Sequence, residues 1–344
     1  MAALLSVQNV RAAYRLANGV ELHAVDDVSL ELREGEVLGV VGESGCGKST
    51  LATILALNAA PPLYVKSGTL QIQGRHADLT KSDPLPRSER GKLISTLPQS
   101  AMNSINPTTR VRDLAYDVLS AHERTTRKAA WGRAGARLEQ LGLPTRVLER
   151  YPHELSGGMR QRVITVISTL LDPTILIADE PTSALDVSSQ RAVVEMLKDL
   201  LARKIISGVL FITHDLPLLR HVADRVAVMY AGKIAELGPT ERVINTPEHP
   251  YSRALVGSIL VPEPHIRAAR VLGIPGSPPD LAAMPKGCRF HPRCPLADAR
   301  SREEVPPLIE VGESGSHFAA CWRTLEARQL LIGSLTGGSD GRAG

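Results

Sequence analysis

GESGCGKST, residues 42 to 50, is the stretch that decides the fold. It fits the pattern G-x-x-x-x-G-K-[ST] of a phosphate-binding loop, or P-loop. The apolar run 36–41 before it is typical of a buried parallel strand, and the helix formers of residues 51–58 predict the helix that follows. Such a turn at a helix N-terminus directs backbone N–H groups and the positive end of the helix dipole toward a phosphate. The stretch therefore predicts an α/β fold that binds a nucleotide.

The loop residues have separate roles in this interpretation. Lys48 can reach the β- and γ-phosphates, and the Ser49 hydroxyl can bind Mg²⁺. Cys46 is either a thiol that makes nucleotide binding sensitive to oxidation or a small residue that fills the turn, and we favour the second. The glycines allow backbone angles and a close approach that a side chain would block. The expected nucleotide-binding residues here are Gly42, Glu43, Ser44, Gly45, Cys46, Gly47, Lys48, Ser49 and Thr50.

A carboxylate pair follows another apolar run further along the chain. TILIADEPTSALD, residues 174 to 186, places Asp179 and Glu180 at the end of a predicted strand. Asp179 can hold hydrated Mg²⁺ through its waters. Glu180 is expected to point the other way on the strand period and to polarise the attacking water.

A second glycine-rich turn, LSGGMRQR at residues 155 to 162, opens another predicted helix. Ser156, Gly157 and Gly158 would present a hydroxyl and backbone N–H groups at its N-terminus, which is an anion site. With these motifs in this order, the chain resembles the ATP-binding subunits of ABC transporters, and more narrowly the ATPases of dipeptide, oligopeptide and nickel importers. The resemblance runs from about Val7 to Trp322.

The resemblance implies an α/β P-loop NTPase fold. It has a RecA-like core, an antiparallel β-subdomain at 7–32 and 69–73, a helical signature subdomain and a loop-rich C-terminal extension. The expected domains are residues 1–244 for nucleotide binding, with the helical part at about 105–172 inserted, 245–330 for the extension and 331–344 for a disordered tail. HPYSRAL, from His249 to Leu255, is similar to the extension of the peptide and nickel importer group.

The resemblance also assigns roles to single residues. Tyr14 would stack on adenine, unless it only packs an early strand, and His214 would contact the γ-phosphate. Residues 156–158 would cap the nucleotide of the opposite subunit, so that ATP lies between two head-to-tail chains. The implied catalytic residues are Glu180, His214 and Gln99, and the implied magnesium ligands are Ser49, Gln99 and Asp179.

Three of the four cysteines, Cys288, Cys294 and Cys321, fall in the extension. Clustered cytosolic cysteines more often bind metal than form disulfides. Three interpretations stay open: a [4Fe–4S] cluster with a further ligand, zinc with His291 or His317 as the fourth ligand, or free thiols. The resemblance implies a fourth cysteine, and Ser301 stands in its place.

Composition limits the partners. The 344 residues include 40 basic and 36 acidic side chains, a net charge of +4, with 3% aromatics, which argues against nucleic acid. No apolar stretch reaches about 18 residues, and no signal peptide is evident, so we expect a chain at the cytoplasmic face of the cell membrane.

The resemblance implies as partners two transmembrane permease subunits and a second ABC ATPase, favoured as a different chain, with a solute-binding protein joined through the complex. The implied function is ATP hydrolysis that energises peptide import. The alternatives are import of nickel or another small solute and, as the less favoured one, a soluble ABC ATPase outside transport.

Overall fold

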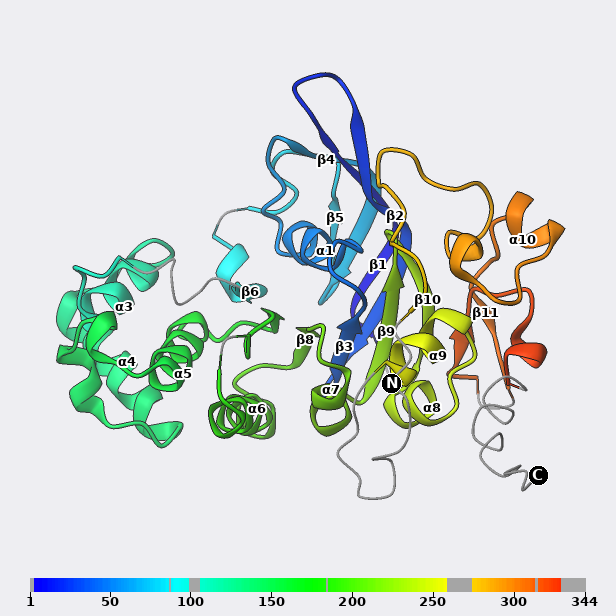
Figure 1. Ribbon diagram of the computed structural model, residues 1–344. Helices are drawn as coiled ribbons and strands as arrows, with labels where there is room; N and C mark the ends of the chain where they lie inside the picture. The colour runs from blue at the N-terminus through cyan, green and yellow to red at the C-terminus, as the bar shows by residue number, and fades with distance from the viewer. Residues whose placement is uncertain are drawn as a thin grey trace, which may run out of the picture.

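The computed structural model describes residues 3–86, 88–98, 106–183, 185–258, 274–312 and 315–328. Gln99 and the predicted tail 331–344 lie outside these residues. The described chain forms two sheets, a group of helices at the left of Figure 1 and the extension at the right.

The larger sheet has eight strands in the order β11-β12-β10-β9-β3-β8-β7-β6. The five strands from β9 to the edge strand β6 are parallel, since β3 pairs with β8 and β9, and β7 pairs with β8 and β6. Every residue of β3 and β8 is buried, as expected of strands covered on both faces. The parallel strands are β3 (Val37–Val41), β6 (Ile94–Leu97), β7 (Ile175–Asp179), β8 (Gly208–Ile212) and β9 (Arg225–Tyr230).

Two hydrophobic clusters cover the two faces of this sheet. Along β3, Val37 and Val41 belong to one cluster, and Leu38 and Val40 belong to the other, because successive side chains of a strand point to opposite faces. The first cluster includes residues of α6 (Val187–Ala202) and α7 (Leu216–Val222). The second includes residues of α1 (Lys48–Leu55) and of the smaller sheet.

The smaller sheet is antiparallel, with the order β2-β1-β4-β5. On β1, Val7 pairs with Leu30 of β2 and with Leu70 of β4, and all three side chains are buried. The predicted antiparallel β-region is therefore confirmed. Its strands are β1 (Ala3–Arg15), β2 (Glu21–Arg33), β4 (Leu63–Ile72) and β5 (Arg75–Asp78).

Helices fill the described chain between β6 and β7. They are α3 (Val111–Ser120), α4 (Arg127–Gln140) and α5 (Gly157–Ser168). Ala115, Ala134 and Val163, one from each helix, are buried in the cluster that also holds Val37 of β3. Arg137 of α4 donates to Thr169 O at 2.7 Å beyond the end of α5. The predicted helical signature region thus packs as a unit onto one end of the sheet (Figure 1).

The extension contains more regular structure than predicted. Besides loops it holds α9 (Pro250–Gly257), α10 (Ala299–Glu303), β11 (Ile309–Glu310) and β12 (Phe318–Ala319), after β10 (Lys233–Pro239) and α8 (Thr240–Asn245). β12 pairs with β10, so the main sheet continues into the extension. Two-residue strands are too short to show an alternating pattern in the sequence.

In the described part of the chain, no helix combines the length and the apolar character needed to cross a bilayer.

Glu236 of β10 joins the extension to the core. Its carboxylate is fully buried and accepts hydrogen bonds from the backbone N–H groups of Glu248, at 2.9 Å, and His249, at 2.8 Å. The same carboxylate lies 2.8 Å from His317 Nε2. A buried carboxylate needs such partners because its desolvation is costly.

His249 begins α9 in this buried region. Its side chain is the N-cap and accepts a hydrogen bond from Tyr251 N at 3.0 Å. Burial lowers the pKa of His249 from its ordinary value of 6.5 to about 4. The imidazole is therefore neutral in the folded protein at neutral pH.

We expect the protein to lose stability as the pH falls from about 6.5 to about 4, because the unfolded chain then binds a proton that folded His249 excludes. The full shift in the His249 pKa corresponds to a loss on the order of 3 kcal/mol in the free energy of unfolding. His249→Asn removes the titrating group and keeps an N-cap acceptor. The drop in Tm between about pH 7 and about pH 5 should be smaller in the variant than in the wild type. An equal drop would contradict the assignment.

Candidate nucleotide-binding site

The P-loop connects the C-terminal end of β3 to the N-terminus of α1 and packs against β2. Gly47 is the N-cap of α1 and has φ 105, so the helix begins at Lys48 and not at the predicted Leu51. A Cβ atom on Gly47 would lie 2.1 Å from the carbonyl oxygen of Ala24. Only a glycine allows the loop to approach β2 this closely.

Lys48 points into the loop. It is 5% exposed, and its Nζ donates to Gly42 O at 2.7 Å and to Glu43 O at 3.0 Å. A phosphate oxygen would give this ammonium a charged partner, which makes a stronger hydrogen bond than a neutral carbonyl. The buried cation and the helix N-terminus therefore fit a nucleotide phosphate.

Ser49 and Asp179 meet across the sheet edge. Ser49 Oγ donates to Asp179 Oδ1 at 3.2 Å, which joins α1 to the end of β7. Burial raises the pKa of Asp179, and the Glu180 charge acts in the same direction, whereas the Ser49 hydrogen bond lowers it. A hydroxyl and a carboxylate in contact are oxygen ligands of the kind that Mg²⁺ takes, so the pair fits this ion.

Glu180 follows β7 with φ 48, a backbone conformation that is uncommon outside glycine. Its N–H donates to Ile212 O at 2.8 Å, which fixes the turn. The direction of the side chain is set by this turn and not, as predicted, by the strand alternation. Glu180 Oε1 lies 3.1 Å from Nδ1 of His214, which follows β8 and is 64% exposed. The carboxylate and the imidazole thus come from two neighbouring strand ends.

Two further predicted residues are Tyr14, which lies beside the P-loop, and Cys46, which lies within it. The Tyr14 hydroxyl is 3.2 Å from Thr50 Oγ1, which brings the half-buried ring next to the end of the P-loop. Cys46 is 5% exposed, and burial raises the pKa of its thiol, which agrees with a small residue that fills the turn. Stacking of Tyr14 on adenine stays a prediction, and Gln99 lies outside the described residues.

The signature turn has the predicted local structure. Ser156 is the N-cap of α5, and its Oγ accepts a hydrogen bond from Met159 N at 3.3 Å. A Cβ atom on Gly158 would lie 2.5 Å from Ser189 Oγ, so this glycine lets α5 approach α6. Figure 1 shows α5 in the helical region, apart from α1. Its action on a second subunit's nucleotide stays a prediction.

The cysteines of the extension lie together. Cys288, Cys294 and Cys321 line one pocket, and the other side chains that line it include His249, His291 and Ser301. Among the residues that the structure describes, no group of three or more His, Cys, Asp or Glu is arranged to hold a metal ion. The iron–sulfur prediction and the zinc alternative therefore have no support.

The three thiols form no disulfide and are partly buried. Burial raises the pKa of Cys321 to about 12 and also raises those of Cys288 and Cys294. His317, the other predicted zinc ligand, lies against the Glu236 carboxylate. Ser301, in the expected place of a fourth cysteine, accepts a hydrogen bond from Asp298 N at 2.8 Å in the capping box of α10.

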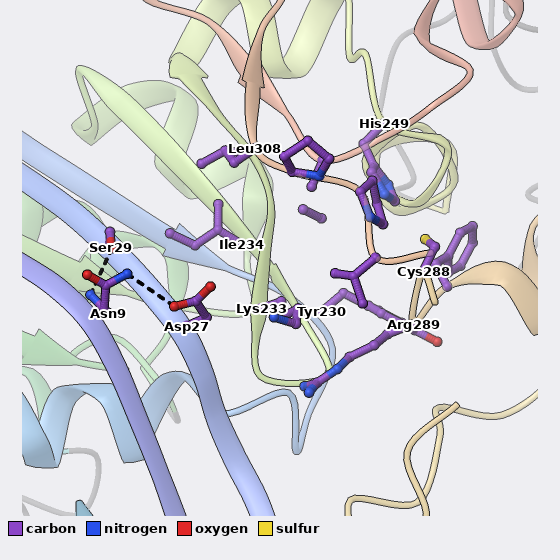
Figure 2. A pocket seen from close by; sticks show the side chains of 16 residues that line it. Asn9, Asp27, Ser29, Tyr230, Lys233, Ile234, His249, Cys288, Arg289 and Leu308 are labelled. Atoms are coloured by element: carbon purple, nitrogen blue, oxygen red, sulfur yellow. Dashed lines mark hydrogen bonds between the residues drawn. The ribbon is translucent and has the colours of Figure 1, made fainter. Parts of the chain in front are cut away.

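A pocket of about 500 Å³ lies between the antiparallel sheet and the extension (Figure 2). Asp27 and Lys233 line it from the core, and Arg289 and Leu308 line it from the extension. Both cations pair with the carboxylate of Asp26, so Arg289 joins the extension to β2 and Lys233 joins β10 to β2. No lining residue belongs to the P-loop, and the pocket is not part of the nucleotide site.

Two residues of the extension that reach the P-loop were not predicted. Arg293 pairs with the Glu43 carboxylate, and the Tyr251 hydroxyl accepts a hydrogen bond from Glu43 N. The segment HPYSRAL contains Tyr251 and could have indicated a functional residue there. No sequence pattern predicted a contact between Arg293 and the P-loop.

Gly47→Ala should destabilise the nucleotide-free protein by about 3 kcal/mol, because the new methyl group meets a backbone oxygen in a strained conformation. Gly45→Ala is the matched control. Gly45 has φ 80 with nothing within 4 Å of its Cβ position, so only the backbone strain of about 1 kcal/mol applies. Urea unfolding of both variants without nucleotide measures the difference, and equal losses would contradict the packing against Ala24.

Comparison with known proteins agrees with this geometry. Residues 25–183 match the ABC transporter family, and residues 235–300 match the family described as oligopeptide/dipeptide transporter, C-terminal region. The chain is 41% identical over 329 residues to the dipeptide transport ATP-binding protein DppD of Bacillus subtilis (strain 168), which covers 94% of this chain and 95% of that protein. It is 41% identical over 326 residues to OppD, the oligopeptide transport ATP-binding protein of the same strain, with 93% and 88% covered.

A solved structure is similar as well. It is the dimeric, post-hydrolysis form of the ATP-binding cassette MJ0796 bound to ADP and Pi, with a TM-score of 0.58, 24% identity, and 69% of this chain and 98% of that chain covered. At this identity the likeness shows the fold alone, and it confirms the P-loop NTPase class. The two relatives align with nearly the whole chain at 41% identity, which shows that they are homologous to it. The chain belongs to the ABC transporter family, among the ATP-binding subunits that carry the oligopeptide/dipeptide transporter C-terminal region.

Proposed function

We propose that this chain is the ATPase subunit that energises a membrane importer of peptides. One observation carries the ATPase assignment: three strand ends bring the P-loop, the Asp179–Glu180 pair and His214 into contact at one edge of the sheet. The peptide assignment is supported by the names of the relatives, which are dipeptide and oligopeptide transport ATP-binding proteins.

Each residue has a role in this proposal. ATP is the substrate, and Mg²⁺ supplies charge neutralisation to its phosphates. Lys48 and the loop N–H groups bind phosphate oxygens, while Ser49 and Asp179 hold the ion. The Glu180 carboxylate accepts a proton from the attacking water as general base. His214, whose Nδ1 lies 3.1 Å from that carboxylate, would contact the γ-phosphate.

The assembly is part of the proposal. The exposed N-cap Ser156 and the two glycines after it would complete the nucleotide site of a second ATPase, favoured as a different chain. Two permease subunits at the cytoplasmic face of the membrane, and a solute-binding protein outside, would complete the importer. Residues 1–244 would form the nucleotide-binding domain, with 105–172 inserted, and 245–330 the extension. Gln99 would contact Mg²⁺ or the attacking water.

Glu180→Gln should leave the Kd for Mg-ATP unchanged and lower turnover by roughly 10²- to 10⁴-fold, because an amide of the same size cannot accept the proton. Phosphate release and nucleotide binding are measured on the assembled complex. Glu195→Gln, a change at a glutamate on α6 whose side chain is 62% exposed, serves as the control. Unchanged hydrolysis in Glu180→Gln would show that the base is another group.

The isolated chain should bind ATP but hydrolyse it poorly, and assembly with the second ATPase and the permease should raise turnover. Ser156→Asp keeps a good N-cap but places a negative charge in the predicted anion site. It should lower turnover of the assembled complex by about tenfold or more, while ATP binding by the isolated chain stays unchanged. Weaker binding by the isolated variant would instead assign the signature to this chain's own site.

A further inference from the structure

Glu43, in the P-loop, is held by two residues of the C-terminal extension. Arg293 Nη1 donates to Glu43 Oε2 at 2.7 Å, and Arg293 Nη2 donates to Glu43 Oε1 at 3.0 Å. Glu43 N donates to the Tyr251 hydroxyl at 2.8 Å. The carbonyl oxygen of Glu43 accepts from Lys48 Nζ at 3.0 Å. A single residue therefore connects the extension to the cation expected to bind phosphate.

The surroundings fix the arginine in this position. The Arg293 side chain is 4% exposed and that of Glu43 is 23% exposed. Arg293 Nε donates to Pro275 O at 2.7 Å, and its Nη1 also donates to the Tyr230 hydroxyl at 3.3 Å. Such a pair is little screened by salt, and loss of one partner leaves an uncompensated charge.

Three aromatic rings support the same contact. Tyr230 of β9 lies with its ring centroid 4.5 Å from that of Tyr251 and 5.2 Å from that of Phe290, and the last two are 5.4 Å apart. One ring comes from the core sheet, one from α9 and one from the loop before Arg293. Aromatic packing of this kind adds stability beyond the buried area, so the Tyr251 hydroxyl and Arg293 are both presented to the P-loop by a packed cluster.

A carboxylate in a phosphate-binding loop opposes the binding of an anion, because like charges repel strongly in a partly buried site. Arg293 neutralises the Glu43 carboxylate and holds it against the extension through two hydrogen bonds. The Tyr251 hydroxyl fixes the backbone of the same residue, and the Glu43 carbonyl in turn fixes Lys48. Charge and shape of the loop thus both depend on the extension.

We propose that Arg293 and Tyr251 are positioning residues for nucleotide binding, through which the docked C-terminal extension neutralises Glu43 and holds the P-loop in its phosphate-binding shape. This role rests on the proposed function, in which ATP binds at Lys48. It assigns the extension a part in the nucleotide site of its own chain.

A double-mutant cycle on the full chain tests this role, with the Kd for Mg-ATP as the readout. Arg293→Ala should raise the Kd by about tenfold, because it leaves the Glu43 charge unpaired. Glu43→Gln alone should lower the Kd by about threefold, because the Arg293 cation beside the site then has no carboxylate partner. The Arg293→Ala/Glu43→Gln double variant should bind more tightly than Arg293→Ala, because no unpaired carboxylate remains. Tyr251→Phe, which keeps the ring and removes the acceptor, should raise the Kd by roughly threefold.

Arg328→Ala is the matched control, since it removes an arginine of the same extension whose partner is Glu248, outside the P-loop. It should bind as the wild type does. Thermal unfolding checks that each variant is folded, and Arg293→Lys, which keeps the charge without the bidentate geometry, gives an intermediate Kd even if Arg293→Ala fails to fold.

Wild-type affinity in Arg293→Ala would overturn the positioning role. So would a double variant as weak as Arg293→Ala, because the loss would then come from an undocked extension and not from the Glu43 charge. A wild-type chain that does not bind Mg-ATP would instead refute the proposed function itself, and the positioning role with it.

Discussion

The parallel pairing of β7, β8 and β3 is the constraint on which the candidate site depends. Ile212 of β8 lies opposite Val40 of β3 on one side and opposite Asp179 of β7 on the other. The loops after these three strands therefore open at one edge of the sheet, which is where parallel α/β sheets place their ligands. Groups distant in sequence, such as Ser49 and Asp179, meet there because the register aligns the strand ends.

Much of this arrangement is encoded locally and could be predicted. The five buried residues of β3 form an uninterrupted apolar run, and the P-loop pattern follows it directly. Ser156 was expected at a helix N-terminus because a glycine-rich turn opens a predicted helix there, and the structure places it at the N-cap of α5. Each of these signals spans a few residues, so no knowledge of distant contacts was needed to read them.

Other features depend on distant contacts or on a single backbone angle. Arg293 and Glu43 are 250 residues apart, and no local pattern marks either as one of a pair. The left-handed backbone of Glu180 is imposed by the neighbouring strand β8, through Ile212. The cysteine spacing suggested a metal site because ligand spacing and the spacing of packed thiols in a loop look alike. Ser301 takes part in a helix cap that only the fold reveals.

Three carboxylates of the core help to dock the extension. Asp26 meets Arg289, Glu43 meets Arg293, and the buried Glu236 receives N–H groups from the start of α9. All three carboxylates have partners, and one of them, Glu43, lies in the loop that has to accept an anion. Arg293 neutralises the Glu43 carboxylate through two hydrogen bonds, while Lys48 of the P-loop contacts only the carbonyl oxygen of Glu43. The negative charge of Glu43 in the nucleotide site is therefore balanced by Arg293, which belongs to a segment that follows the nucleotide-binding core in the sequence.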